Sequence, residues 1–176
     1  MIGGFTSGYN SASRSIQFFN IRQQKWMPER RLNLPPGIAE THQGVTFDPT
    51  SRLLYIVSGQ LGGACKAATT AVVQINVDTG TYKSLPPLPA GRYFPGVAII
   101  SHQEVRHLHV FGGASEMRNQ SATDHWRLTL AQEEDRNLSW QEIENVPDGG
   151  AHGLSISHGG YLLYRIFDNG SRGFNS

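Results

Sequence analysis

The chain has 176 residues, of which 38% are hydrophobic and 16% are charged, and its net charge at pH 7 is +1. This balance gives no electrostatic reason to expect nucleic acid as a partner, or direct membrane contact by this segment. No apolar stretch approaches the roughly 20 residues of a membrane-spanning helix. The single cysteine, Cys65, excludes an internal disulfide framework.

Three apolar runs of strand type recur along the chain, and each ends on a glycine. They are Met1-Ile2-Gly3-Gly4, Leu54-Tyr55-Ile56-Val57-Ser58-Gly59 and Leu108-His109-Val110-Phe111-Gly112-Gly113. Their last glycines are 55 and 54 residues apart, and such a period is the signature of a repeat architecture. The glycines predict that each strand ends in a turn whose backbone conformation a Cβ would hinder, with a positive φ at Gly113.

Other landmarks keep the same step. A second strand-like run follows each glycine, at 15–20, 72–76 and 125–129, and an aromatic residue comes next, at Trp26, Tyr82 and Trp140. Proline and glycine then precede a strand that begins on Gly44, Gly96 or Gly153. Each unit therefore predicts four short strands, near 43–48, 53–58, 71–77 and 81–84 in the middle copy. Four antiparallel strands per repeat of about 50 residues are typical of a propeller blade.

The order of these features resembles the kelch repeat, because a Gly-led strand, a strand ending in Gly-Gly, a strand ending in an aromatic residue and a tryptophan follow one another. The resemblance implies an all-β fold, a kelch-type β-propeller fragment of about three four-stranded blades that do not close a ring. We expect a partial blade over 1–34, blades over 35–85 and 86–146, a partial blade over 147–164 and an irregular polar tail over 165–176. Such an open array exposes blade faces, here including Phe18 and Trp26 at one end and Leu162 and Tyr164 at the other.

The resemblance also implies a function. It predicts a non-catalytic scaffold without a cofactor, which binds a protein or peptide partner through loops on one propeller face. These loops follow the second strand of each blade or precede the first. Arginine and tyrosine on strand-anchored loops are favoured contacts for a peptide or carboxylate. The predicted contact residues are Arg14, Arg30, Arg31, Arg92, Tyr93, Arg118 and Asn119. Arg92 has an alternative role, as an ion-pair partner of a neighbouring blade's loop.

An enzymatic alternative stays open, in which this chain is part of a propeller-core oxidase or glycan-processing enzyme with catalytic residues in other blades. His107 and His109 alternate along one strand and could form a metal pair. A packing role is favoured, because His109 aligns with Tyr55 of the preceding repeat, and we predict no metal site. His42 could act as an acid–base group, but the same slot holds Phe94 and Ala151, so no chemistry repeats there.

Glycosylation sequons begin at Asn119, Asn137 and Asn169, and the first two fall in predicted loops. Some plant kelch proteins that this chain resembles carry an N-terminal membrane anchor and face a secretory lumen. The sequons fit that placement, so we favour the secretory lumen slightly over the cytoplasm.

Overall fold

The computed structural model describes residues 1–6, 8–63, 66–103, 105–116, 120–130, 138–150, 154–158 and 161–165. Within these residues the fold is all-β, with one short 3-10 helix, η1 (Gly8–Asn10). The strands are β1 (Ser15–Asn20), β2 (Lys25–Asn33), β3 (Gly44–Asp48), β4 (Leu53–Val57), β5 (Val72–Asn76), β6 (Tyr82–Leu85), β7 (Gly96–His102), β8 (Val105–Phe111), β9 (His125–Leu130), β10 (Trp140–Ile143), β11 (Leu154–His158) and β12 (Tyr161–Arg165).

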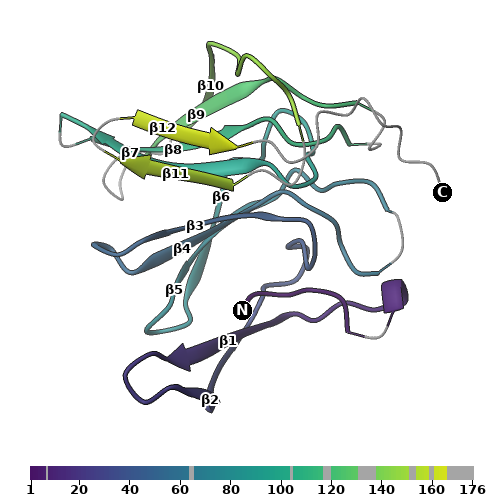
Figure 1. Cartoon of the computed structure of the whole chain (residues 1–176), viewed down its shortest axis with the longest axis vertical. Coiled ribbons are helices and arrows are strands. Elements are labelled where there is room, and N and C mark those ends of the chain that lie inside the picture. Colours follow the sequence, from purple (N-terminus) through teal and green to yellow (C-terminus); the bar gives the residue numbers. More distant parts are fainter. Residues whose placement is uncertain are drawn as a thin grey trace.

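The strands form four antiparallel sheets, which we call blades 1 to 4. Blade 1 is β1–β2, blade 2 is β3–β4–β5–β6, blade 3 is β7–β8–β9–β10 and blade 4 is β11–β12. Figure 1 shows them stacked in chain order, from blade 1 at the bottom to blades 3 and 4 at the top, in an open arrangement. The four strands predicted for the middle repeat are confirmed to within one residue at every end.

Each glycine pair ends a strand in the same way. Gly113 has φ +86°, Gly59 has +96° and Gly4 has +103°, which confirms the predicted turn at Gly113. The amide N–H of each of these glycines donates to a carbonyl of the next blade. The three acceptors are Glu40 (2.8 Å), Arg92 (2.9 Å) and Gly150 (2.8 Å) for Gly4, Gly59 and Gly113 respectively. The repeated turn therefore joins neighbouring blades as well as ending a strand.

Apolar side chains fill the space between successive blades. One cluster joins blade 2 to blade 3 and contains Tyr55, Val57, Val72, Leu85, Leu108, Val110, Trp126 and Leu128. A second cluster joins blade 1 to blade 2 and contains Ile16, Leu54, Ile56, Val73 and Ile75. Alternate residues of β4 face opposite neighbours, since successive side chains of a strand point to opposite faces. This is why the strand is apolar along its whole length.

The structure corrects the prediction that Arg30 and Arg31 lie on a loop, because β2 extends from Lys25 to Asn33. The register places Gln17 opposite Arg31 and Phe18 opposite Met27, so residues 28–30 bulge out of the ladder. Pro28 lies in this bulge, as expected for a residue that cannot donate a ladder hydrogen bond.

The exposed residue of β1 also differs from the prediction. Phe18 packs against the cluster between blades 1 and 2, whereas its neighbour Phe19 is exposed. Alternation along the strand explains the difference, since Phe19 and not Phe18 pairs with Trp26 on the side turned away from blade 2.

The repeated aromatic residues of the fourth strands occupy different environments. Trp140 packs against the cluster between blades 2 and 3, and its Nε1–H donates to the Pro86 carbonyl (2.9 Å). Trp26 and Tyr82 are exposed, as predicted for Trp26. Side chains in this slot face the preceding blade, as the hydrogen bond of Trp140 to Pro86 after blade 2 shows.

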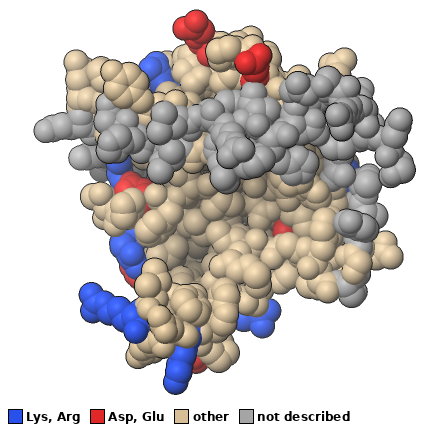
Figure 2. Space-filling view, in the orientation of Figure 1, with Lys and Arg blue, Asp and Glu red and all other residues tan. Residues whose placement is uncertain are grey.

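Several predicted features lie outside the described residues. These are Cys65, Arg118, Asn119, Asn137, Ala151 and Asn169, the side chain of Tyr164, and all of the predicted tail except Arg165 at the end of β12. No helix among the described residues is long and apolar enough to cross a membrane. Figure 2 shows Lys and Arg side chains mainly at the end of the molecule that blade 1 forms, with broad uncharged areas elsewhere.

Candidate functional site

One side of the molecule carries the loops that follow the second strands and precede the first strands, and we call it the loop face. Figure 1 shows η1 and the loop after β4 at this side, on the right. Isolated bridges hold these loops to one another: Thr41 pairs with Gln60, Gln60 with Ala68, and Tyr93 with Ala114. The loops are thus extensions of the sheets rather than free segments, and side chains on them have fixed positions.

Three aromatic side chains from successive blades meet on the loop face. Phe5 follows the glycine pair of blade 1, His42 precedes β3 and Phe94 precedes β7. The His42 ring lies edge-to-face with Phe5 (5.5 Å between centroids) and with Phe94 (4.3 Å). His42 and Phe94 are half-buried and Phe5 is exposed. We call these three residues the aromatic cluster.

The backbone of the aromatic cluster is strained at two positions. His42 has φ +58° and Phe94 has φ +50°, values that side chains with a Cβ rarely adopt and that cost roughly 1–3 kcal/mol each. The N–H of Phe94 donates to the His42 carbonyl (2.7 Å), which links the two positions across the blades. Strain of this kind collects at functional sites. The sequence shows that His42 and Phe94 share a repeat slot, but nothing in it reveals the positive φ.

Two of the predicted contact residues are buried. Arg92 is 7% exposed and Tyr93 is 2% exposed. The Arg92 guanidinium forms an ion pair with Asp124. It also lies over the Trp126 ring, 4.7 Å from the ring centroid, which is within the roughly 6 Å of a cation–π contact. The structure therefore gives Arg92 an ion-pair role, but its partner Asp124 precedes β9 of the same blade 3 and does not belong to a neighbouring blade, as the alternative had it. The buried Tyr93 ring packs edge-to-face against the His42 ring of the aromatic cluster, with 5.8 Å between the ring centroids.

The other described candidates are divided between two sides of the molecule. Arg14 lies on the loop face, where it donates to the Leu34 carbonyl (2.5 Å) and pairs with Glu40 (3.7 Å). Arg30 and Arg31 belong to β2 rather than to a loop. Arg30 lies over the Phe18 ring (4.5 Å) and reaches Asp78 of blade 2 (3.1 Å).

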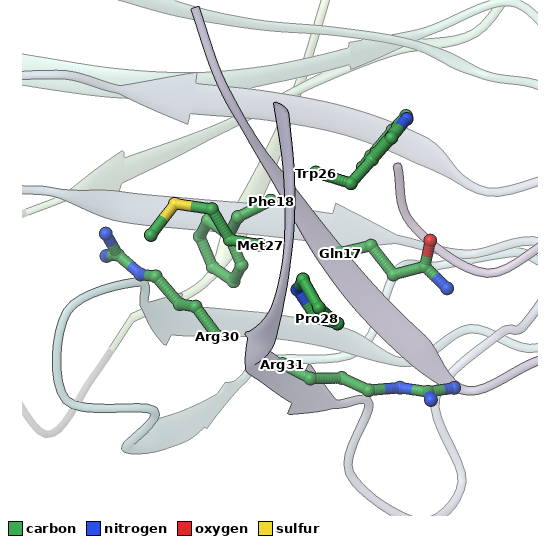
Figure 3. Close-up of a pocket in the computed structure, with 7 residues that line it drawn as sticks. All are labelled: Gln17, Phe18, Trp26, Met27, Pro28, Arg30 and Arg31. Carbon is green, nitrogen blue, oxygen red and sulfur yellow. The ribbon is translucent and has the colours of Figure 1, made fainter. Parts of the chain in front are cut away.

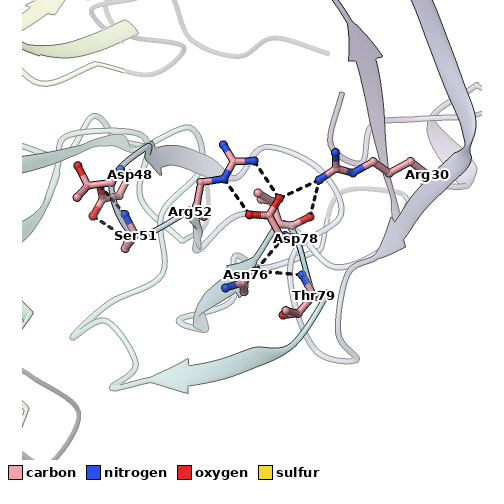
Figure 4. Close-up of polar contacts among 9 residues, drawn as sticks. Arg30, Asp48, Ser51, Arg52, Asn76, Asp78 and Thr79 are labelled. Atoms are coloured by element: carbon pink, nitrogen blue, oxygen red, sulfur yellow. Dashed lines mark hydrogen bonds and ion pairs between the residues drawn. The ribbon is translucent and has the colours of Figure 1, made fainter.

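Charged residues on the side opposite the loop face also connect the blades. Figure 4 shows Asp78, in the turn after β5, held between Arg30 of blade 1 and Arg52 of its own blade. Asp48 binds Arg106 of blade 3 and accepts from Ser51 (2.8 Å) and Thr50 (2.9 Å). Burial raises the pKa of Asp48, but the hydrogen bonds from Ser51, Thr50 and Arg106 outweigh it and leave the pKa lowered. Asp48 is therefore a structural anion.

The closest histidine pair of blade 3 is His109 with His125, and not His107 with His109, the pair that was considered as metal ligands. His109 is buried and lies 3.0 Å from His125 through Nδ1 and Nε2, whereas the His107 and His109 centroids are 6.2 Å apart. Burial, helped by the charges of His125, His107 and Arg127, lowers the pKa of His109 to about 4. Among the described residues, no three His, Cys, Asp or Glu side chains could together hold a metal ion. His109 occupies the slot of Tyr55, and both are buried, which agrees with a packing role.

Comparisons with known proteins bear on the fold. No family model matches the chain. A kelch repeat-containing protein of Arabidopsis thaliana is 36% identical over 161 residues, which cover 89% of this chain and 35% of that protein. The solved structure of YjhT aligns with 87% of this chain and 44% of its own at a TM-score of 0.63 and 17% identity.

These findings and the sheets together define the class of protein: the sheets are blades of a kelch-type β-propeller. The chain is a homologue of the Arabidopsis kelch repeat-containing protein over most of its own length, so its repeats are kelch repeats. It spans about a third of that relative and less than half of YjhT. The activity and partners of a whole propeller are therefore matters for proposal.

Proposed function

We propose that this chain is a non-catalytic kelch scaffold that binds a protein or peptide partner through the loop face, with the aromatic cluster at the centre of the contact. The observation that carries the proposal is the positive φ of His42 and Phe94. Glycine would occupy either position without backbone strain, whereas histidine and phenylalanine hold it at a cost of roughly 1–3 kcal/mol each. Residues held in such a conformation cluster at binding sites.

The chemistry of the cluster indicates the kind of ligand. Aromatic rings pack against other aromatic and aliphatic groups, so we propose that an apolar side chain of the partner contacts the cluster at the exposed Phe5 ring. Arg14, beside Glu40 at the margin of the same face, supplies a cation for a carboxylate of the partner. Aromatic and arginine residues on a rigid frame are typical centres of protein interfaces.

Replacement of Phe94 by glycine tests the proposal directly. Peptides are first selected from a phage-displayed random library on the wild-type chain, and their dissociation constants are measured by fluorescence anisotropy. We expect Phe94→Gly to weaken binding by more than about tenfold while its thermal midpoint changes little, because relief of the strain at φ +50° offsets the lost packing of the ring. A lower midpoint with unchanged affinity would give Phe94 a packing role and contradict the proposal.

Tyr82→Gly is the matched control. Tyr82 is an exposed aromatic residue on a strand that is not part of the loop face, so its removal should leave the peptide affinity unchanged. Equal losses in both variants would place the peptide elsewhere on the blades.

Placement in the secretory lumen stays a prediction. Digestion of the natural protein with an N-glycosidase tests it, since occupied sequons give a shift in electrophoretic mobility and a cytoplasmic protein gives none.

A further inference from the structure

Residues 91–95 lead into β7 and include Phe94, the strained residue of blade 3 in the aromatic cluster. Backbone hydrogen bonds hold three successive residues of this segment to blades 2 and 3 in turn. The partners are Gly59 of blade 2 for Arg92 (2.9 Å), Ala114 of blade 3 for Tyr93 (2.8 and 3.0 Å), and His42 of blade 2 for Phe94 (2.7 Å). A strained conformation persists only where its surroundings fix it in this way.

The side chain of Arg92 fixes the segment further. Its guanidinium forms an ion pair with Asp124, which precedes β9, and lies over the Trp126 ring of β9 at 4.7 Å. The Arg92 N–H donates to the Ser58 hydroxyl (2.7 Å), so the main chain and the side chain are held at the same residue. Arg92 stands two residues before Phe94, and a shift of Arg92 would therefore be passed to the backbone that carries the ring.

Burial distinguishes Arg92 from the other arginines that form ion pairs in the described part of the chain. Its side chain is 9% exposed, whereas the exposed fractions of the other four lie between 37% and 49%. By contrast with Arg92, the arginines of β2, Arg30 and Arg31, extend from opposite sides of the β1–β2 hairpin (Figure 3). Water and salt screen a buried ion pair less than an exposed one, so the Arg92 pair holds its partners more firmly.

The same slot of the preceding repeat has a similar arrangement with the charges reversed. Glu40 stands two residues before His42, as Arg92 stands two residues before Phe94. The carbonyl of each accepts a hydrogen bond from the last glycine of the preceding blade's turn. Glu40 forms an ion pair with Arg14 (3.7 Å). The feature that the two slots share is therefore an ion pair ahead of a ring with positive φ, and not the sign of the charge.

We propose that the ion pair between Arg92 and Asp124 positions the Phe94 ring for the partner, which makes Arg92 a positioning residue of the loop face. This inference rests on the proposed function, because the ring belongs to the proposed contact. With the pair in place, Phe94 keeps φ +50° and its ring centroid lies 4.3 Å from that of His42. Without the pair, the backbone relaxes toward the negative φ that residues with a Cβ prefer, and the ring leaves the edge of His42.

A fluorine label at Phe94 reports the position of the ring in the full 176-residue chain. Para-fluorophenylalanine is incorporated at this one position, and fluorine NMR spectra are recorded without ligand, well below the thermal midpoints. We expect one resonance in the labelled wild type, and a shifted or second resonance in both Arg92→Met and Asp124→Asn, because either change breaks the ion pair. Unchanged spectra in the two folded variants would overturn the proposal. A change in Arg92→Met alone would overturn it too, since the ion pair would then not be the cause.

Peptide affinity gives a second measurement. The peptides selected on the wild-type chain should bind Arg92→Met about three- to tenfold more weakly. In the Phe94→Gly background the same change should cost no further affinity, because the positioned ring is gone. Equal losses in both backgrounds would contradict the proposal. If Phe94→Gly itself binds as the wild type does, the proposed function fails, while the fluorine spectra, which need no peptide, still decide the role of Arg92.

Arg52→Met is the matched control. Arg52 forms a similar group on the side opposite the loop face, where it pairs with Asp78 (2.9 Å) (Figure 4) and lies over the Phe47 ring (5.6 Å). Its replacement should leave the Phe94 resonance and the peptide affinity unchanged. A change as large as that in Arg92→Met would mean that loss of any arginine pair moves the resonance, and would overturn the assignment to Arg92.

Discussion

Ser58 occupies a slot in which the other two repeats have glycine, and it adopts the same backbone conformation. Its φ is +53°, against +59° at both Gly3 and Gly112. The hydroxyl accepts from the N–H of Arg92 (2.7 Å) and lies close enough to the carbonyl oxygens of Thr69 (2.6 Å) and Arg92 (2.9 Å) to donate to one of them. These bonds offset the strain, and they tie blade 2 to blade 3 at a point where glycine has no side chain to do so.

Gly113 allows strain and steric overlap to be separated by experiment. A Cβ at Gly113 would lie 2.6 Å from the Tyr93 carbonyl oxygen, whereas a Cβ at Gly4, in the same slot of blade 1, would meet nothing within 4 Å. Both glycines have positive φ. We expect Gly113→Val to lower the free energy of unfolding by at least ~1 kcal/mol, and Gly4→Val to lower it less. Urea titrations of both variants measure the difference, and equal losses would mean that the overlap relaxes.

His109 gives stability a dependence on pH. Its folded pKa is about 4, below the ordinary histidine value of roughly 6.5. Between these values the unfolded chain binds a proton that the folded chain does not, so stability falls as the pH decreases through this window. Burial also lowers the pKa of His125, helped by Arg127 and opposed by a hydrogen bond with the backbone of Glu144, so its contribution has the same sign.

His109→Tyr, which copies Tyr55 into the equivalent slot, should reduce this dependence. Thermal midpoints of the variant and the wild type are compared at about pH 7 and about pH 5, on either side of the ordinary histidine pKa. The variant should lose less stability between the two pH values, whatever its stability at neutral pH. An equal loss in both proteins would assign the dependence to other groups.

At the scale of elements, the hairpin of blade 1 shows where sequence-based prediction stops. The strands of blade 2 were predictable because apolar runs, turn residues and glycine pairs coincide there. Strand β2 was not, because a polar sequence that contains Pro28 resembles a loop. It is a strand because β1 pairs with it on both sides of the bulge. Arg30 was accordingly assigned to the wrong surface.

The candidate site was predictable only in part. Loop order and period place it on one face, and Arg14 lies there as expected. The aromatic cluster escaped prediction because a left-handed backbone is visible in sequence only when glycine or asparagine marks it, and here histidine and phenylalanine adopt it. The burial of Arg92 was equally hidden, since its partner Asp124 is 32 residues away.

The ion pairs between blades differ in strength according to burial. The Asp48 side chain is 5% exposed and that of Asp78 is 47% exposed. We expect Asp48→Ala to lower the free energy of unfolding by about 1–3 kcal/mol, because Ser51, Thr50 and Arg106 lose a buried acceptor. Asp78→Ala should have a smaller effect that disappears at high salt, as for exposed pairs. Chemical denaturation at low and high salt checks both, and a larger loss for Asp78→Ala would contradict this order.

At the scale of the whole molecule, each blade is stabilised by its neighbours. Blade 2 is covered on both faces, whereas the described part of blade 1 is covered on one. Stability in such a stack is a sum of terms for each repeat and its adjacent interfaces. Local unfolding should therefore begin at blade 1 and reach the middle blades last.

Hydrogen exchange in dilute solution measures this gradient. The amides of Ile56 in β4 and Val110 in β8, both fully buried, should exchange most slowly, and those of β1 and β2 should exchange fastest. The same rate throughout would mean that the chain unfolds as one unit, and slower exchange in β1 than in β4 would contradict the proposed order.

The hydrogen bonds from Gly4, Gly59 and Gly113 to the following blade have a consequence for how such chains change by recombination. Each donor belongs to one repeat and each acceptor to the next, at the same slot. When recombination deletes or adds one whole period, the two blades that become neighbours still supply a glycine N–H from the first and an acceptor carbonyl from the second, wherever in the repeat the chain was cut. Loss of half a period leaves a glycine N–H facing a strand interior. Blade number can therefore drift in steps of one repeat at little structural cost, while intermediate lengths are selected against.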